Sequence, residues 1–238
     1  MIEKIKKNII YNKMYVLYII TSILLILGTI TMFLNIDYYQ QKNINVWLLG
    51  DSLFDHSEFN DVGQYNIENL LSLAVKKIPN ITYKNKGKAN AGLIASKWFD
   101  NDIVSNKNIN QNDIIFISIG GNDIIDYVKN DINIEENMKY IIENVSRIID
   151  YYKQSVIDSS KQIIYVIPYK YFMTNDMYFK LIDIFKKLCK QWNIDYISLE
   201  DFKIYIDYKV DKNSESDVPH YTKRGVNKLL SKILGKLF

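Results

Sequence analysis

The chain has 238 residues, of which 48% are hydrophobic and 24% are charged, so it can form the core of an α/β domain and is too apolar for a disordered chain. The net charge of +3 arises in the first 13 residues and the remainder is neutral, so we expect no basic surface and no nucleic-acid partner. The single cysteine excludes an intrachain disulfide.

Residues 15–34 form an uncharged apolar run, close to the roughly 20 residues that a helix needs to cross a bilayer. Lysines precede the run, whereas Asp37 and Lys42 nearly cancel after it, so the positive-inside rule predicts a cytoplasmic amino terminus. A cleaved signal peptide is the alternative, although the run is long for one and no small-x-small cleavage site follows it. We therefore expect a single-pass protein of the cell membrane with a cytoplasmic tail at 1–14, a transmembrane helix at 15–34, a linker at 35–44 and an extracellular or periplasmic domain at 45–238.

Short apolar runs and helical stripes alternate through this domain. The runs are apolar on both faces, which suits strands of a parallel sheet covered on both sides. They predict strands at 46–49, 81–86, 113–119, 163–167 and 196–198. Apolar residues at helical spacing predict helices at 67–78, 93–99, 134–156, 181–192 and 226–237. The order of these elements predicts a three-layer α/β/α sandwich with a parallel five-stranded sheet.

Two residues in or next to these helices can be assigned a role. Thr222 precedes the last helix and can cap its amino terminus. Cys189 lies on the apolar face of the helix at 181–192, so we expect a buried core thiol rather than a nucleophile.

Polar clusters stand at strand ends and in the last loop of the predicted domain. In a doubly wound sheet the carboxyl ends of the strands form the ligand crevice, so residues far apart in the sequence can meet there. Each cluster alone is compatible with an ordinary turn. Together they supply what serine hydrolysis needs, namely a hydroxyl, an imidazole base, a carboxylate to orient it and oxyanion donors. The clusters are Gly50-Asp51-Ser52, Gly120-Gly121-Asn122-Asp123 and Asp217-Val218-Pro219-His220, with a small-residue loop containing Gly92 after the second strand.

These blocks and their order make residues 45–237 resemble the SGNH hydrolases, also called GDSL esterases and lipases. The block that begins at Gly50 is similar to the first block of the family, which implies that Ser52 is the nucleophile. The block that ends at His220 is similar to the last, which implies His220 as the base and Asp217 as its partner. The resemblance also implies a flavodoxin-like sheet order and a site that needs neither a cofactor nor a metal.

The remaining blocks carry the implied oxyanion hole. The block at 120–123 matches the Gly-x-Asn-Asp pattern of the family, which implies that the Asn122 side-chain amide donates to the oxyanion. The N–H groups of Ser52 and of a glycine after the second strand complete the hole. Gly92 is preferred for this glycine, because the residues around it open the next helix, and Gly87 is the alternative.

Three further polar residues in or near the blocks are expected to have roles outside catalysis. His56 follows Ser52 by four residues, but no carboxylate is spaced to orient it, so we expect it at the pocket rim or on the surface. We expect Asp51 and Asp123 to shape their turns by accepting hydrogen bonds from backbone amides, without acid–base work.

The predicted function is that of a membrane-anchored serine esterase, a carboxylic ester hydrolase. An outward-facing enzyme of this type would remove O-acyl groups from cell-envelope glycans or lipids, with short O-acyl groups on polysaccharide or peptidoglycan as the leading substrates. Two alternatives stay open at this stage. One is an O-acyltransferase with the same residues, in which a sugar hydroxyl replaces water, and the other is a non-catalytic anchored module that binds an envelope partner.

Overall fold

The computed structural model describes residues 44–51, 53–54, 67–78, 81–84, 93–100, 109–130, 132–168, 175–202, 208–209 and 220–238. These elements belong to one compact unit, Ile44–Phe238. The strands are β1 (Ile44–Gly50), β2 (Ile81–Lys84), β3 (Ile114–Ser118), β4 (Ile163–Val166), β5 (Asp195–Ile197), β6 (Tyr208–Lys209) and β7 (His220–Tyr221). The helices are α2 (Ile67–Val75), η2 (Ala95–Lys97), α3 (Gly121–Lys129), α4 (Ile134–Lys153), α5 (Ser159–Gln162), α6 (Asn175–Trp192) and α7 (Lys223–Leu237).

The predicted membrane segment at 15–34 lies outside the described residues, as do the predicted tail and most of the predicted linker. Within the described ranges, no helix combines the length and the apolar character that crossing a bilayer requires.

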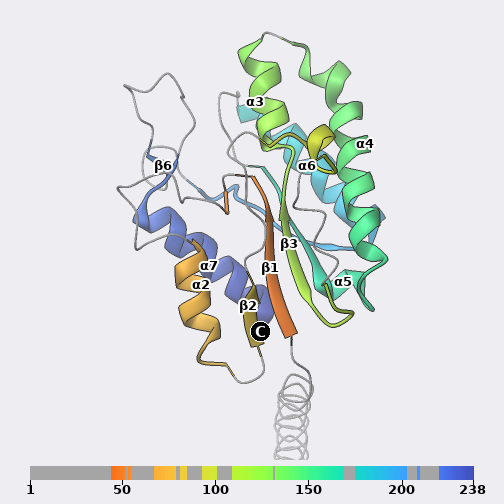
Figure 1. Cartoon of the computed structure of the whole chain (residues 1–238). Helices are drawn as coiled ribbons and strands as arrows, with labels where there is room; N and C mark the ends of the chain where they lie inside the picture. Colours follow the sequence, from red (N-terminus) through yellow and green to blue (C-terminus); the bar gives the residue numbers. More distant parts are fainter. Residues whose placement is uncertain are drawn as a thin grey trace, which may run out of the picture. The chain divides into compact units, whose positions relative to one another are not determined.

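Five parallel strands form the central sheet in the order β2-β1-β3-β4-β5. The chain runs from β1 to β2 on one side and then crosses to β3 on the other side of β1, which is the flavodoxin-like order. Figure 1 shows β1 and β3 at the centre of the sheet. The prediction of a parallel five-stranded sheet is confirmed, and the reversal of strand order between β1 and β3 predicts the ligand crevice at the carboxyl ends of these two strands.

Helices cover both faces of this sheet. Trp47 and Leu49 of β1 and Tyr165 of β4 belong to one buried cluster with residues of α4 and α6. Side chains alternate along a strand, so the residues between them face the opposite layer, where α2 and α7 lie (Figure 1). All described side chains of β1, β3 and β4 are buried, as the two-sided apolar runs predicted. Cys189 is fully buried on α6, as predicted.

Several element boundaries differ from the predicted ones. The α-helix α2 ends at Val75 rather than Ile78, because the amides of Lys77 and Ile78 bond to carbonyls only three residues back, at 3.3 and 2.9 Å. The predicted helix at 93–99 is a single 3-10 turn, η2, and α4 ends at Lys153 instead of Val156. Thr222 caps α7 as predicted, since its Oγ1 accepts a hydrogen bond from the Gly225 amide at 3.2 Å.

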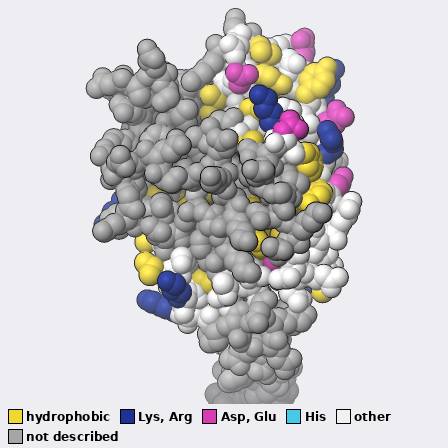
Figure 2. Space-filling model, viewed as in Figure 1, with side chains coloured by type: hydrophobic (Ala, Val, Ile, Leu, Met, Phe, Trp, Pro, Cys, Tyr) yellow, Lys and Arg dark blue, Asp and Glu magenta, His cyan; other side chains and the backbone are white. Residues whose placement is uncertain are grey.

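The largest difference is α3, which begins directly after β3 where the sequence indicated only a loop and later a long helix. Among its described residues, the buried large apolar side chains are Ile124 and Ile125, too few to form a clear helical stripe, and its first residues are turn-forming types. Figure 2 shows acidic, basic and hydrophobic side chains interspersed over the described surface of α3 and α4, without a gathering of one charge on that part of the face.

Candidate active site

The ends of β1 and β3 meet at the predicted crevice. Gly50 pairs in register with Ser118, and the Asp51 amide donates to the Ser118 carbonyl at 2.9 Å. Gly50 has a φ of 151°, and a Cβ built on it would lie 1.9 Å from the Ser118 carbonyl oxygen. Only glycine therefore allows β1 to turn this close to β3.

A buried side-chain bond strengthens this junction. The Ser118 hydroxyl donates to Asp51 Oδ1 at 2.8 Å, and the Leu53 amide donates to the same oxygen at 3.1 Å. The Phe54 amide closes a turn on the Asp51 carbonyl at 3.1 Å. Asp51 thus shapes its turn through a backbone amide, as predicted, and also binds the neighbouring strand.

Burial dominates the electrostatics of Asp51, which is only 3% exposed. Loss of hydration raises the pKa of this carboxyl to about 7, while the hydrogen bonds from Ser118 and Leu53 act in the opposite direction. The nearby Asp123 charge raises the pKa further. The protonation of Asp51 therefore changes near neutral pH, next to the position of the predicted nucleophile.

The first turn of α3 packs against the same junction. Gly120 has a φ of 95°, which turns the chain from β3 into the helix. A Cβ built on Gly121 would lie 3.4 Å from Asp51 Oδ2 and 3.7 Å from Pro168 Cβ, so the helix begins close to the ends of β1 and β4.

Two side chains of this turn hold the segment that follows the predicted oxyanion glycine. Asn122 Nδ2 donates to the Leu93 carbonyl at 3.0 Å. The Asp123 carboxylate accepts from the Ala95 amide at 3.2 and 2.9 Å, and burial raises its pKa. Asp123 thus accepts from a backbone amide, but this amide lies on a separate segment, whereas the prediction placed it in the turn of Asp123 itself. A side-chain amide has two N–H donors, so the Asn122 amide can serve a second acceptor besides Leu93.

Asn122 is the one predicted site residue whose side chain the structure describes. His220 is described in its backbone only, where it pairs with Lys209 in the antiparallel β6–β7 ladder. The other predicted site residues lie outside the described ranges, as does His56. They are Ser52, Gly87, Gly92 and Asp217.

Ser118 is a functional candidate that the sequence analysis missed. The only signal was a polar residue in an otherwise apolar strand next to the Gly-x-Asn-Asp block. Its bond to Asp51 depends on the register of β1 against β3, which the sequence pattern does not contain. Among the described residues, no group of His, Cys, Asp and Glu side chains could hold a metal ion.

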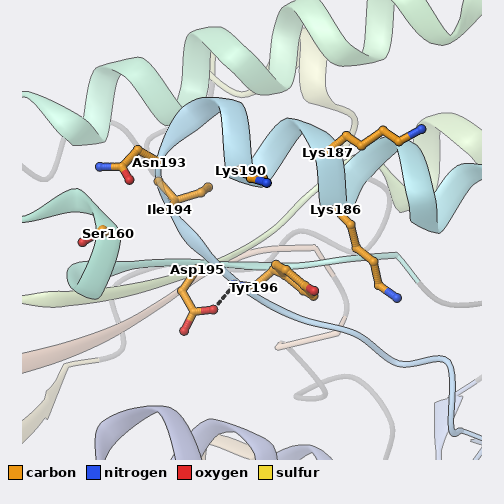
Figure 3. Close-up of a pocket in the computed structure, with 8 residues that line it drawn as sticks. All are labelled: Ser160, Lys186, Lys187, Lys190, Asn193, Ile194, Asp195 and Tyr196. Carbon is orange, nitrogen blue, oxygen red and sulfur yellow. Dashed lines mark hydrogen bonds between the residues drawn. The ribbon is translucent and has the colours of Figure 1, made fainter.

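A hollow of about 540 Å³ lies elsewhere, beside the edge strand β5 and the carboxyl end of α6. Figure 3 shows that the ammonium groups of Lys186 and Lys187 point in different directions instead of toward one point. Lys186 is held by Glu200 at 2.6 Å, and Asp195 is held by Lys236 at 2.6 Å. The hollow lies where β5 begins, whereas the predicted crevice lies where strands end, so it is separate from the candidate site.

Comparison with known proteins identifies a family for the chain and solved structures with a similar fold. A family model described as GDSL-like lipase/acylhydrolase matches residues 46–233. No curated protein matches the chain.

Three solved structures illustrate the similarity of fold. A lipolytic protein of the G-D-S-L family from Veillonella parvula is 15% identical, with a TM-score of 0.59 over 81% of this chain and 97% of that chain. A psychrotrophic esterase from Pseudoalteromonas sp. is 14% identical, with a TM-score of 0.57 over 81% and 96%. An acetyl xylan esterase from Geobacillus stearothermophilus is 16% identical, with a TM-score of 0.56 over 82% and 95%. At these identities, the likeness shows a common fold.

Proposed function

Because the chain belongs to the GDSL-like lipase/acylhydrolase family, we propose that it is a serine esterase with Ser52 as the nucleophile, His220 as the base and Asp217 as the partner that orients His220. Hydrolysis of acyl esters is the activity that this membership supports at the level of the family. The proposal adds the residues, the mechanism and the substrate.

The observation that carries the proposal is the junction of β1 and β3. Asp51 and Ser118 are 67 residues apart in the sequence, yet their side chains bond at 2.8 Å. The chain that leads into Ser52 therefore lies beside the chain that leads into Asn122. Serine hydrolysis needs these two motifs at one site, and both follow strands that end at the same edge of the sheet.

The mechanism begins when Ser52 Oγ attacks the ester carbonyl carbon while His220 takes the hydroxyl proton. The negative charge that develops on the carbonyl oxygen is stabilised by the N–H groups of Ser52 and Gly92 and by the Asn122 amide. The ester C–O bond then breaks, and the alcohol leaves with the proton from His220. Water, deprotonated by His220, attacks the acyl group on Ser52, and the serine hydroxyl is restored as the acid departs.

For the substrate, we propose short O-acyl groups on cell-envelope glycans, with lipids at the membrane surface as the competing class. The uncharged run at 15–34 supports this choice, because an anchor with a cytoplasmic amino terminus would hold the domain on the outer side of the membrane. An acetyl xylan esterase shares the fold, so the fold accommodates an acetylated polysaccharide in at least that protein.

Turnover by the full-length protein tests this function. The wild type should hydrolyse p-nitrophenyl acetate and release acetate from an O-acetylated glycan, whereas Ser52→Ala should abolish both activities. Ser72→Ala, which removes a hydroxyl from α2, is the matched control and should keep full activity. A Ser52→Ala protein with full activity would exclude the assignment. Transfer of the acyl group to an added glycan acceptor, without free acid, would identify a transferase instead.

A further inference from the structure

We propose that Asp51 and Ser118 form a positioning pair, in which the Asp51 carboxyl fixes the backbone around Ser52 against the end of β3. This inference rests on the proposed function, because it assigns the pair a role in placing the nucleophile. Neither residue touches the substrate in this account. Both act through the chain that carries Ser52.

The first support is that one oxygen holds two separate segments. Asp51 Oδ1 accepts from the Ser118 hydroxyl at 2.8 Å and from the Leu53 amide at 3.1 Å. Leu53 is the residue after Ser52, and Asp51 is the residue before it. The backbone N–H of the residue that follows the nucleophile and the hydroxyl of Ser118 are therefore bonded to a single buried atom.

The second support is the close packing around this atom. The Asp51 amide is bonded to the Ser118 carbonyl at 2.9 Å, so Ser118 holds Asp51 through both its backbone and its side chain. A Cβ on Gly50 would lie 1.9 Å from the Ser118 carbonyl oxygen, and a Cβ on Gly121 would lie 3.4 Å from Asp51 Oδ2. The end of β1 therefore lies directly against Ser118, and the first turn of α3 lies beside the carboxyl, which limits the positions that the carboxyl can adopt.

The third support is that further hydrogen bonds connect this junction to the segment beside the implied oxyanion hole. Four residues beyond Ser118, Asn122 donates to the Leu93 carbonyl at 3.0 Å, and Asp123 accepts from the Ala95 amide. The end of β1, the first turn of α3 and the segment at 93–95 thus form one bonded unit. A shift at Asp51 would move the nucleophile relative to the oxyanion donors, and a misplacement of about 1 Å can cost about 10²-fold in rate.

Four variants of the full-length protein test the pair with p-nitrophenyl acetate as the probe. Asp51→Ala and Ser118→Ala break the bond, whereas Asp51→Asn keeps an acceptor oxygen for Ser118 and Leu53. Asp113→Asn is the matched control, because Asp113 is also buried and accepts from Asn45 and Trp47 at 2.8 and 2.7 Å, but at the opposite end of β3.

We expect Ser118→Ala and Asp51→Ala to lower kcat by about 10²-fold while KM stays nearly constant. Asp51→Asn should recover most of the kcat, and Asp113→Asn should lose stability but keep its kcat. A folded Ser118→Ala protein with the kcat of the wild type would overturn the inference, and this variant decides alone if Asp51→Ala does not fold. An equal loss of kcat in Asp113→Asn would also overturn it, since any weakened sheet would then have the same effect.

The wild type separates this inference from the proposed function. If the wild type shows no Ser52-dependent turnover, the proposed function fails and the positioning role fails with it. If the wild type turns over through Ser52 and the variants match it, the positioning role alone fails.

Discussion

At the scale of single residues, the buried carboxyl of Asp51 is the least expected feature of the site. A carboxylate is costly to bury without a cation, and the described contacts of Asp51 are a hydroxyl, a backbone amide and the nearby charge of Asp123. Its pKa rises to about 7 in the folded protein from the ordinary value of 3.8. The folded state therefore binds a proton more tightly than the unfolded chain does, and this links stability to pH.

The sign of that link gives a prediction for Asp51→Asn. The contribution of the raised pKa to stability is complete below the unfolded pKa and is lost as the pH rises toward the folded pKa of about 7. The slope is roughly 1.4 kcal/mol for each pH unit and falls as Asp51 ionises in the folded state, so the wild type should lose about 2 kcal/mol relative to Asp51→Asn between about pH 5 and about pH 7. Urea unfolding of both proteins across this range measures the difference. Parallel pH profiles of the two free energies of unfolding would show that Asp51 has an ordinary pKa.

At the scale of elements, α3 matters most, because its first turn brings Asn122 to the edge of the sheet. The helix begins one residue after Gly120 and is joined to the segment before η2 by the bond from Asn122 to Leu93. No clear pattern in the sequence indicates α3, since glycine, asparagine and aspartate are turn residues that also open helices. The sequence pattern therefore predicts a loop for the element that carries Asn122, the proposed oxyanion donor.

Asn122→Ala tests what this turn contributes. If the amide stabilises the oxyanion, the variant should lose about 10²–10³-fold in kcat, as other side-chain donors of this kind do. Asn144→Ala is the matched control, because Asn144 also lies in a helix and its Nδ2 also donates to a backbone carbonyl, that of Tyr140 at 2.9 Å. An Asn122→Ala enzyme with an unchanged kcat would remove this residue from the oxyanion hole, whereas equal losses in both variants would point to a general effect on helices.

At the scale of the whole molecule, the sequence predicted the sheet well and the contacts at its edge poorly. Runs such as 113–119 are apolar on both faces, which leaves few interpretations besides a central parallel strand. The bond between Asp51 and Ser118 could not be predicted in this way, because it depends on the register of two strands 67 residues apart. The order of the motifs predicts one edge of the sheet for the proposed site, and the junction of β1 and β3 lies at that edge.

The central claim is that Ser52, His220 and Asp217 meet to activate a serine hydroxyl, and labelling with a fluorophosphonate probe tests it most directly. The full-length wild type should react with the probe, and both Ser52→Ala and His220→Ala should fail to react although they fold. This probe reports an activated serine without knowledge of the natural ester. Labelling of Ser52→Ala at the rate of the wild type, or no labelling of a folded wild type, would contradict the account.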